Sequence, residues 1–346
     1  MTVNLYSDTQ TRPTEGMRRA MSEAEVGDEQ RGLDPTVNDL QERVAALLGH
    51  EAALFLPSGT MCNAIAFRLH LRPGGDEVLL DRTAHPRVAE AGGPGSISGA
   101  QLTLLDGDGG IFTPEQLAEA IHPAADRYGP RTRLVSVEQT TNMGGGRVWP
   151  LEAVRSVLEV ARGAGMRAHL DGARLMNAVV ASGVAAADWA SEFDTAWLDF
   201  TKGLGAPVGA CLAGSRELIE EAWRYKQMWG GAMRQAGVVA AAGRYALDHH
   251  VERLAEDHEN ARALAAGLAE VPGVSIDVDR VETNIVIFSV ADPESLVAAL
   301  AASGVEVSRA GRASVRMVTH LDVDRAGCEH AVAAVREALG AARPSR

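Results

Sequence analysis

Between Glu51 and Gly214 the chain alternates short apolar runs with amphipathic stretches, and this alternation restricts the possible folds more than any other feature. Strands that alternate with helices form a mostly parallel sheet with helices on its faces. Such a sheet binds ligands at the carboxyl ends of its strands. The expected strands are Ala52–Pro57, Glu77–Asp81, Leu102–Asp106, Leu134–Glu138, Ala168–Asp171, Thr195–Phe200 and Gly209–Ala213. We therefore predict an α/β fold with a seven-stranded, mostly parallel sheet.

A second, smaller α+β domain is expected towards the C-terminus, because 346 residues exceed the usual size of a single core. A long helical region from about Gln235 to Leu268, with His249 and His250 as surface residues near its middle, precedes it. Beyond Pro272 the pattern restarts as strand 284–290, helix 293–303, strands 305–308 and 314–318, and a last helix from 324. The expected boundaries are an N-terminal arm over 1–14 outside the core, a large domain over 15–245 and a small domain over 246–346.

The charge and the cysteines limit the partners and the compartment. A formal charge of −13 without a basic stripe or tail opposes binding to nucleic acid or to an anionic membrane surface. Small-molecule chemistry is favoured instead. Cys62, Cys211 and Cys328 have no metal-ligand spacing and are odd in number, so we expect reduced thiols, a cytoplasmic protein and no metal site. The chain has no leader-like N-terminus and no apolar run long enough to span a membrane.

Asp171 and Lys202 follow two neighbouring strands of the expected sheet, each flanked by glycine. A lysine amine in a partly desolvated pocket can form a Schiff base with an aldehyde. A carboxylate can keep the ring nitrogen of a pyridine protonated. The pair therefore predicts a site for pyridoxal phosphate (PLP). The alternative for each residue alone is structural, with Asp171 capping the helix that begins near Ala173 and Lys202 solvated in a turn.

Two further segments lie at the same edge of the expected sheet. Ser58-Gly59-Thr60 precedes a helix, whose first amides can bind a phosphate, although such a sequence is more often an ordinary helix cap. His85 follows the second strand and can place its ring on a flat heterocycle, or can simply begin a helix.

Arg174 and Arg316 are candidates to bind the carboxylate of an amino acid substrate. A guanidinium offers two parallel N–H donors to a carboxylate. Arg316 has the stronger claim, because a charge inside the apolar run Ser314–Val318 needs a partner, which would be either a substrate or a structural carboxylate.

The chain resembles the low-specificity L-threonine aldolases, which are PLP enzymes of the beta-eliminating lyase group with the aspartate-aminotransferase-like fold (fold type I). The resemblance covers nearly the whole chain. The motifs that carry it include Ser7-Asp8-Thr9, Asp34-Pro35-Thr36-Val37-Asn38, Ser58-Gly59-Thr60, Leu170-Asp171-Gly172-Ala173-Arg174, Lys202-Gly203-Leu204-Gly205, Met233-Arg234-Gln235 and Arg316-Met317-Val318-Thr319-His320.

The resemblance implies a role for each motif residue. Lys202 would form the Schiff base, Asp171 would contact the pyridine nitrogen, and His85 would stack over the ring. Gly59 and Thr60 would hold the phosphate. The substrate carboxylate would be held by Ser7, Arg174 and Arg316. The resemblance further implies a homotetramer, a dimer of dimers, with active sites between paired subunits and Arg234 near the neighbouring site. Its reaction is retro-aldol cleavage of a β-hydroxy-α-amino acid, such as L-threonine or L-allo-threonine, to glycine and an aldehyde.

Around the expected substrate side chain the sequence departs from the family pattern. Arg31 replaces a tyrosine of the family, and Ala89 replaces an aromatic residue. Thr141 replaces a histidine, and Gln227 replaces a lysine. Tyr128 aligns with a second active-site histidine of the family. We hypothesise that Arg31, together with Arg87, admits a larger or more polar, acidic β-substituent. The alternative is that these residues are replacements on loops without effect on the substrate.

Two other functions remain open at this point. The first is a related PLP lyase, transaldolase or racemase that acts on a different amino acid through the same carbanion. The second is a PLP-binding protein without turnover, which retention of Lys202, Asp171 and His85 disfavours. The sequence argues against a nicotinamide-dependent dehydrogenase, because no Gly-x-Gly-x-x-Gly motif follows the first strand.

Overall fold

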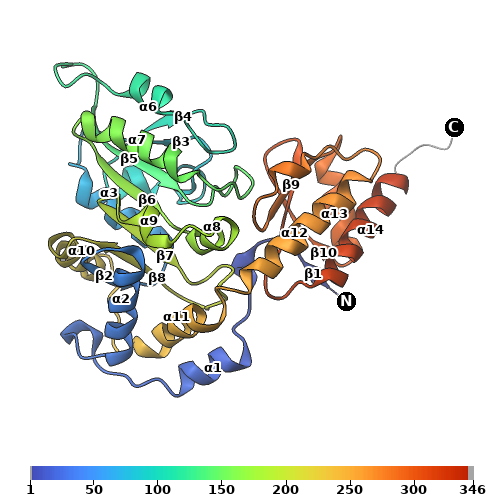
Figure 1. Cartoon of the computed structure of the whole chain (residues 1–346), viewed down its shortest axis with the longest axis horizontal. Helices are drawn as coiled ribbons and strands as arrows, with labels where there is room; N and C mark the ends of the chain where they lie inside the picture. The colour runs from blue at the N-terminus through green and yellow to red at the C-terminus, as the bar shows by residue number, and fades with distance from the viewer. Residues whose placement is uncertain (1, 342–346) are drawn as a thin grey trace.

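One seven-stranded sheet in the order β2-β8-β7-β6-β5-β3-β4 organises the larger part of the molecule (Figure 1). The structure is a computed structural model that describes residues 2–341. The strands are β2 (Ala52–Leu56), β3 (Asp76–Asp81), β4 (Gln101–Leu105), β5 (Arg131–Glu138), β6 (Arg167–Asp171), β7 (Thr195–Asp199) and β8 (Ala210–Gly214). β8 pairs antiparallel with β2 and with β7, and the remaining pairs of this sheet are parallel. The predicted seven-stranded, mostly parallel sheet is confirmed.

Helices cover both faces of this sheet, as the alternation of the strand residues requires. Ala53 and Phe55 of β2 face a core shared with α2, α7, α9 and α11, whereas Leu54 and Leu56 face α3 and α10. The helices of this part are α1 (Glu15–Ser22), α2 (Pro35–Leu48), α3 (Gly59–His70), α4 (His85–Val88), α5 (Gly93–Ser96), α6 (Pro114–Ala120), α7 (Leu151–Gly163), α8 (Leu175–Ser182), α9 (Ala186–Ala190), α10 (Arg216–Met228) and α11 (Gly237–His249).

The C-terminal part forms a second core around a three-stranded antiparallel sheet of order β11-β12-β9. Its elements are α12 (Leu254–Ala269), β9 (Ile285–Ser289), α13 (Pro293–Ala302), β10 (Val305–Glu306), β11 (Ser308–Arg309), β12 (Ser314–Val318) and α14 (Arg325–Ala341). The α+β composition follows the prediction. The expected boundary at residue 245 falls inside α11, and the expected single helical region is two helices, α11 and α12, separated around His250. His250 is buried rather than exposed, and its Nδ1–H donates to the carbonyl oxygen of Leu204 (2.7 Å).

The N-terminal segment belongs to the smaller core, which corrects the expectation of an arm that stays outside any core. Strand β1 (Val3–Asn4) pairs in parallel with β10, and Val3 and Leu5 are buried in the core of the C-terminal part. Two apolar residues were too few to predict a strand from sequence, because the partner strand lies three hundred residues further along the chain. The chain therefore enters the small domain first and then crosses to the large one.

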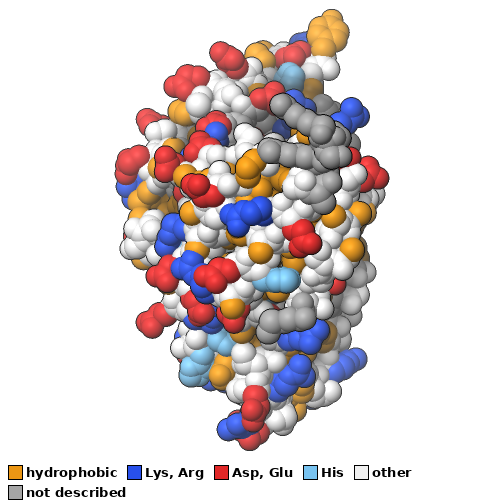
Figure 2. Space-filling view, turned by 90° about the vertical axis from the view of Figure 1, so that its right-hand side faces the viewer, with side chains coloured by type: hydrophobic (Ala, Val, Ile, Leu, Met, Phe, Trp, Pro, Cys, Tyr) orange, Lys and Arg blue, Asp and Glu red, His pale blue; other side chains and the backbone are white. Residues whose placement is uncertain are grey.

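The surface and the helices agree with a mixed-charge globular chain. In Figure 2, which faces the small domain, acidic and basic side chains are interspersed over the visible surface. Among residues 2–341 no helix combines the length and the apolar character needed to cross a membrane.

Candidate active site

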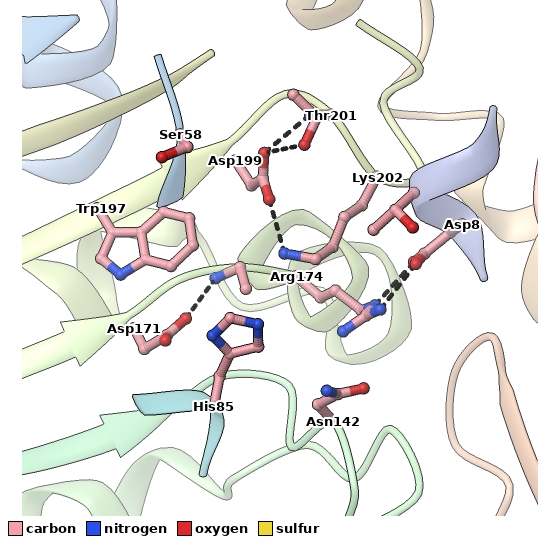
Figure 3. Close-up of polar contacts among 12 residues, drawn as sticks. Asp8, Ser58, His85, Asn142, Asp171, Arg174, Trp197, Asp199, Thr201 and Lys202 are labelled. Atoms are coloured by element: carbon pink, nitrogen blue, oxygen red, sulfur yellow. Dashed lines mark hydrogen bonds and ion pairs between the residues drawn. The ribbon is translucent and has the colours of Figure 1, made fainter. Parts of the chain in front are cut away.

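Side chains from six different segments meet at the carboxyl ends of the parallel strands (Figure 3). They come from the ends of β5, β6 and β7, from the starts of α3 and α4, and from the N-terminal segment before α1. In a parallel sheet these ends lie at one edge, and the loops that follow them bring their side chains together. The fold therefore gathers residues that are far apart in the sequence.

Lys202 lies in the turn after β7 and is largely buried, with 14% of its side chain exposed. Its Nζ donates to Oδ2 of Asp199, the last residue of β7, at 2.6 Å. The other oxygen of Asp199 accepts from the backbone N–H and the hydroxyl of Thr201, each at 2.8 Å. The hydroxyl of Thr11 donates to the carbonyl oxygen of Lys202 (3.2 Å). These contacts fix the turn, so the reading of Lys202 as a solvated lysine is wrong.

The carboxylate of Asp171 is buried at the end of β6. Its Oδ1 accepts from the N–H of Ala173 at 3.1 Å and its Oδ2 from Nδ2 of Asn63 at 2.8 Å. Burial raises the pKa of Asp171, while the charge of His85, the hydrogen bond from Asn63 and the charge of Lys202 oppose that rise. The cap to Ala173 exists, but it uses only one oxygen and does not begin α8, whose N-cap is Arg174.

His85 begins α4 and lies between three carboxylates. Its Nδ1 is 2.9 Å from Oε1 of Glu90, and its backbone N–H donates to Oε1 of Glu138 (3.2 Å). Burial lowers the pKa of His85, but the hydrogen bond that His85 donates to Glu90 and the charges of Asp171 and Glu90 outweigh burial and raise it. Because Glu90 can only accept, Nδ1 carries the hydrogen and Nε2 is left to face the site.

Glu138, the last residue of β5, is a neighbour of Asp171 and shares its environment. Its Oε2 accepts from the N–H of Asn142 (2.8 Å). Burial and the charge of Asp171 raise the pKa of Glu138 to about 7. Two adjacent buried carboxylates resist carrying full charge together, which makes this edge of the sheet receptive to a positive group.

The start of α3 faces the same edge and offers free amides. Ser58 is the N-cap, with its hydroxyl accepting from the N–H of Met61 (3.3 Å), and Thr60 is exposed. A Cβ on Gly59 would lie 2.2 Å from the ring of Trp197, so only glycine fits there. The N-terminus of this twelve-residue helix is therefore open to an anion.

Arg174 is held by a carboxylate of the protein itself. Its Nε and Nη2 donate to the two oxygens of Asp8, each at 2.7 Å, and both side chains are buried. Ser7 accepts from the N–H (3.2 Å) and the hydroxyl (2.9 Å) of Thr9, which orients the turn that carries Asp8. Burial raises the pKa of Asp8, but the charge of Arg174 and its hydrogen bond, then the charges of Lys202 and Arg316, hold it well below its ordinary value. Only Nη1 of Arg174 remains for a substrate.

Arg316, in the middle of β12, is buried, and its guanidinium forms no ion pair with a carboxylate of residues 2–341. Its Nη2 donates to Oδ1 of Asn142 (2.9 Å) and its Nη1 to the carbonyl oxygen of Tyr6 (3.4 Å), while its buried Nε has no hydrogen-bond partner in the described part of the chain. Burial and the nearby charge of Arg174 lower the pKa of Arg316 to about 10. A buried cation of this kind favours binding of an anion, so of the two alternatives for Arg316 the structure favours a ligand over a structural acid.

Other predicted residues lie apart from these contacts. Arg234 pairs with Asp28 (3.2 Å), and Arg31 is exposed in the short helix Glu29–Arg31. Arg87 and Ala89 are exposed beside α4, and Tyr128 is fully exposed in the loop before β5. The contacts described here do not bring these residues to Lys202.

Sequence reasoning missed five residues that complete the site: Asp8, Asn63, Glu90, Glu138 and Asp199. Asp199 was detectable, since a carboxylate three residues before a strand-end lysine is within ion-pair reach in a tight turn. The others act through contacts with residues far away in the sequence, such as Asn63 with Asp171, 108 positions apart. No local signal marks such a residue.

The donor set matches the groups of PLP. A buried lysine suits the aldehyde, a buried carboxylate suits the ring nitrogen, and an open helix N-terminus suits the phosphate. The buried, unpartnered Nε of Arg316 suits the carboxylate of an amino acid bound beside it. The chain has only one other lysine, Lys226, which is buried in an ion pair with Glu29, so Lys202 is the candidate for the aldehyde. Within the part of the chain that the structure describes, no cluster of side chains could hold a metal ion.

Known proteins are similar to this chain in sequence and in fold. The family model described as beta-eliminating lyase matches residues 4–293. Low-specificity L-threonine aldolase 1 of Arabidopsis thaliana is 38% identical over 344 residues, covering 97% of this chain and 96% of the relative. The low specificity L-threonine aldolase of Escherichia coli K12 is 40% identical over 324 residues, covering 93% and 95%.

The fold agrees with a solved relative. The structure of the threonine aldolase of Leishmania major superposes with a TM-score of 0.83 at 19% identity, over 96% of this chain and 98% of that one. The architecture is that of the fold-type I PLP enzymes, as the resemblance implied. The chain belongs to the beta-eliminating lyase family, and within it to the low-specificity L-threonine aldolases, and is a lyase.

Proposed function

We propose that this chain is a PLP-dependent aldolase that cleaves a β-hydroxy-α-amino acid, L-threonine or L-allo-threonine or a relative with a larger or more polar side chain, to glycine and an aldehyde. The observation that carries the proposal is the buried Arg316, which lacks a carboxylate partner among the described residues and shares the neighbourhood of Asp8 with Lys202. It supplies a carboxylate-binding group next to an amine that can join an aldehyde. Both are needed to orient an amino acid for bond cleavage at Cα.

Each residue has a defined task in this reaction. Arg316 binds the substrate carboxylate, assisted by Nη1 of Arg174, with Ser7 orienting the turn of Asp8. Asp199 holds Nζ of Lys202 in place, and the amides of Gly59 and Thr60 bind the phosphate. Asp171 holds the proton of the ring nitrogen. When bound, PLP supplies the electron sink for the bond that breaks at Cα.

His85 is the group placed to take the proton of the substrate hydroxyl. Glu90 fixes the hydrogen on Nδ1, so Nε2 is the nitrogen that accepts a proton. The charges of Glu90 and Asp171 raise the pKa of His85, which makes it a stronger base than an isolated histidine. Burial of Glu138, Asp171 and Glu90 around it keeps bulk water from competing for that proton.

Glycine release tests the proposed reaction. The PLP-loaded protein is incubated separately with L-threonine, L-allo-threonine, phenylserine and the 3-hydroxyaspartates, with Lys202→Ala as control. We expect glycine and an aldehyde in equal amounts from at least one substrate, and none from the control. Keto acid and ammonia in their place would favour a related lyase, and a bound cofactor without product would contradict the proposal.

We also propose that Arg31 and Arg87 adapt the site to an acidic or polar β-substituent. Both side chains are exposed, Arg87 on the same short helix as His85 and Arg31 at the end of the short helix Glu29–Arg31 before α2. Charged groups at the entrance of a site select by charge. Arg31→Ala and Arg87→Ala should lower kcat/KM for 3-hydroxyaspartate several-fold more than for L-threonine. Equal effects on both substrates would show that these replacements do not set specificity.

For the assembly, we propose a homotetramer with sites between paired subunits, and for the compartment the cytoplasm. Large apolar residues are exposed next to Arg31 and Arg234: Val26, Leu33 and Met228. Apolar groups in such a position favour burial against another subunit, and light scattering of the PLP-loaded protein tests this. The three cysteines are buried and free, which fits a reducing compartment.

A further inference from the structure

A line of polar side chains is buried under the face of the sheet that α3 covers. His169 precedes Asp171 by two residues on β6, so both point to the same face, and Thr195 on β7 is the register partner of His169. Asn63 and His70 are seven residues apart on α3, which is two turns, so both point from the helix towards the sheet. None of these residues was assigned a role from the sequence.

Four hydrogen bonds connect the line from end to end. His70 Nε2 is 2.9 Å from Oγ1 of Thr195, which is 2.8 Å from Nδ1 of His169. His169 Nε2 is 3.0 Å from Oδ1 of Asn63, and Nδ2 of Asn63 is 2.8 Å from Oδ2 of Asp171. His70 also lines a cavity of ≈ 470 Å³ together with Arg167, the first residue of β6, and Asp194, the residue before β7. The line thus runs from the amino edge of the sheet to Asp171 at its carboxyl edge.

Trp197 fixes the orientation of the Asn63 amide. Its indole Nε1–H can only donate, and it donates to Oδ1 of Asn63 at 2.8 Å. The amide nitrogen of Asn63 therefore faces the carboxylates of Asp171 and Glu90, to both of which it donates at 2.8 Å. An amide turned the other way would oppose its oxygen to two acids and its NH2 group to an indole N–H.

The orientation of Asn63 determines the rest of the line. His169 Nε2 must carry a hydrogen to bond Oδ1 of Asn63, and burial lowers the pKa of His169 to about 3, so the ring is neutral and its Nδ1 accepts. The hydroxyl of Thr195 donates to that Nδ1, and its oxygen accepts from Nε2–H of His70, whose pKa burial lowers to about 4. Every donor in the line therefore points towards Asp171. Hydrogen bonds in such a series polarise one another and favour negative charge at the accepting end.

We propose that His70, Thr195, His169 and Asn63 are positioning residues that orient the Asp171 carboxylate and favour its ionised form against burial. The inference rests on the proposed PLP cofactor, whose ring nitrogen Asp171 would contact. His85 and Glu90 face Asp171 from the α4 side, Lys202 from the turn after β7 and Glu138 from β5. The variants below leave these four residues unchanged, so their effect on Asp171 is the same in every variant.

Thr195→Val tests the line at its middle, with Thr195→Ser as the matched control. Valine keeps the volume of threonine and removes the hydroxyl, whereas serine keeps the hydroxyl and removes a methyl group. Thr195 touches neither Asp171 nor the expected cofactor position. We expect the dissociation constant for PLP to rise roughly threefold to tenfold in Thr195→Val and to stay near wild type in Thr195→Ser.

The visible absorption of bound PLP gives a second readout. A ring nitrogen that is protonated less completely withdraws fewer electrons, so the lysine nitrogen joined to the cofactor becomes more basic. The midpoint of the absorption change with pH should therefore move to higher pH in Thr195→Val. Equal shifts in Thr195→Val and Thr195→Ser would show a packing effect and overturn the inference, as would a Thr195→Val protein identical to wild type.

His70→Leu and His70→Gln repeat the test at the outer end, where burial is incomplete and folding is less sensitive. Glutamine retains an N–H donor and leucine does not, so only leucine should shift the midpoint, in the same direction and by less than Thr195→Val. No shift in His70→Leu would contradict a line that extends to the cavity. A wild-type protein that binds no PLP would instead overturn the proposed cofactor and the inference with it.

Discussion

At the scale of a single residue, Asp8 connects the N-terminal segment with the large and the small domain. Its carboxylate accepts two hydrogen bonds from Arg174 of the large domain and one from Asn284 (3.0 Å), which precedes β9 of the small domain. The residue itself belongs to the N-terminal segment. Because Asp8 also faces Lys202 and Arg316, it sets the balance of charge between the two arginines and the lysine.

Asp8→Ala should be strongly destabilising, because it leaves the buried guanidinium of Arg174 without a carboxylate. We expect the free energy of unfolding in urea to fall by about 3–5 kcal/mol. Asp106→Ala removes the partner of Arg82 in an exposed ion pair and should leave the unfolding midpoint unchanged. Equal losses in the two variants would show that burial of the Asp8–Arg174 pair has no energetic consequence.

The sequence was informative about residues whose chemistry is local. Asp171 and Lys202 could be placed because each lies at or just after the end of a strand, and buried strands can be recognised in the sequence as apolar runs. Asp8 could not be placed, because its role depends on Arg174, 166 positions away, and on Asn284, 276 positions away. For the same reason the sequence could favour Arg316 over Arg174 as a carboxylate ligand but could not show that Asp8 occupies Arg174, which the structure does.

At the scale of a secondary-structure element, helix α3 serves two functions at different positions along its length. Its first turn presents free amides to the active site, and its buried face carries Asn63 under the sheet. Gly59 permits this position, because its backbone lies against the ring of Trp197. A change at the first turn should therefore affect anion binding and packing together.

Gly59→Ala should displace α3 or Trp197, since the added Cβ would approach the ring to 2.2 Å. We expect weaker PLP binding in an absorption titration and a loss of about 1–3 kcal/mol in the free energy of unfolding. Gly163→Ala, in the last turn of α7 where a Cβ meets nothing within 4 Å, should leave both unchanged or raise stability slightly. Unchanged PLP affinity in Gly59→Ala would argue against the start of α3 as the phosphate site.

The elements differ in how well the sequence predicts them. The seven strands of the large sheet were placed to within three residues, since buried parallel strands are continuous apolar runs. The break between α11 and α12 was missed, because the helical pattern continues through it and only the burial of His250 against Leu204 marks the turn. Strand β1 was missed because two residues carry no periodicity.

At the scale of the whole molecule, the contact between the two domains includes buried polar side chains. His258 on α12 is buried against α8, where Nδ2 of Asn177 donates to its Nε2 (3.1 Å). Burial and the charge of Arg262 lower the pKa of His258 to about 4. The histidine is therefore neutral in the folded chain at pH values where it would be protonated in the unfolded chain.

This lowered pKa predicts a loss of stability in acid. The stabilising contribution is fully present above the unfolded pKa of about 6.5, and it is lost as the pH falls from there to about 4, because the unfolded chain binds a proton that the folded chain does not. His258→Gln keeps an acceptor for Asn177 and does not titrate. Between pH 6.5 and 4 the wild type should therefore lose about 1–3 kcal/mol more stability than His258→Gln.

Urea unfolding at several pH values measures this difference. The two proteins should have parallel curves above pH 7 and should diverge below 6.5. Parallel curves throughout would contradict a buried, neutral His258 at the domain joint.

The claim on which the account depends is that Lys202 holds PLP at the carboxyl edge of the sheet. Because the chain has only two lysines, borohydride reduction of the PLP-loaded protein, followed by digestion and mass spectrometry, can assign the labelled residue without ambiguity. The account predicts a phosphopyridoxyl label on the peptide that contains Lys202 and none on the peptide that contains Lys226. A label on Lys226, or no label on a protein that binds PLP, would contradict it.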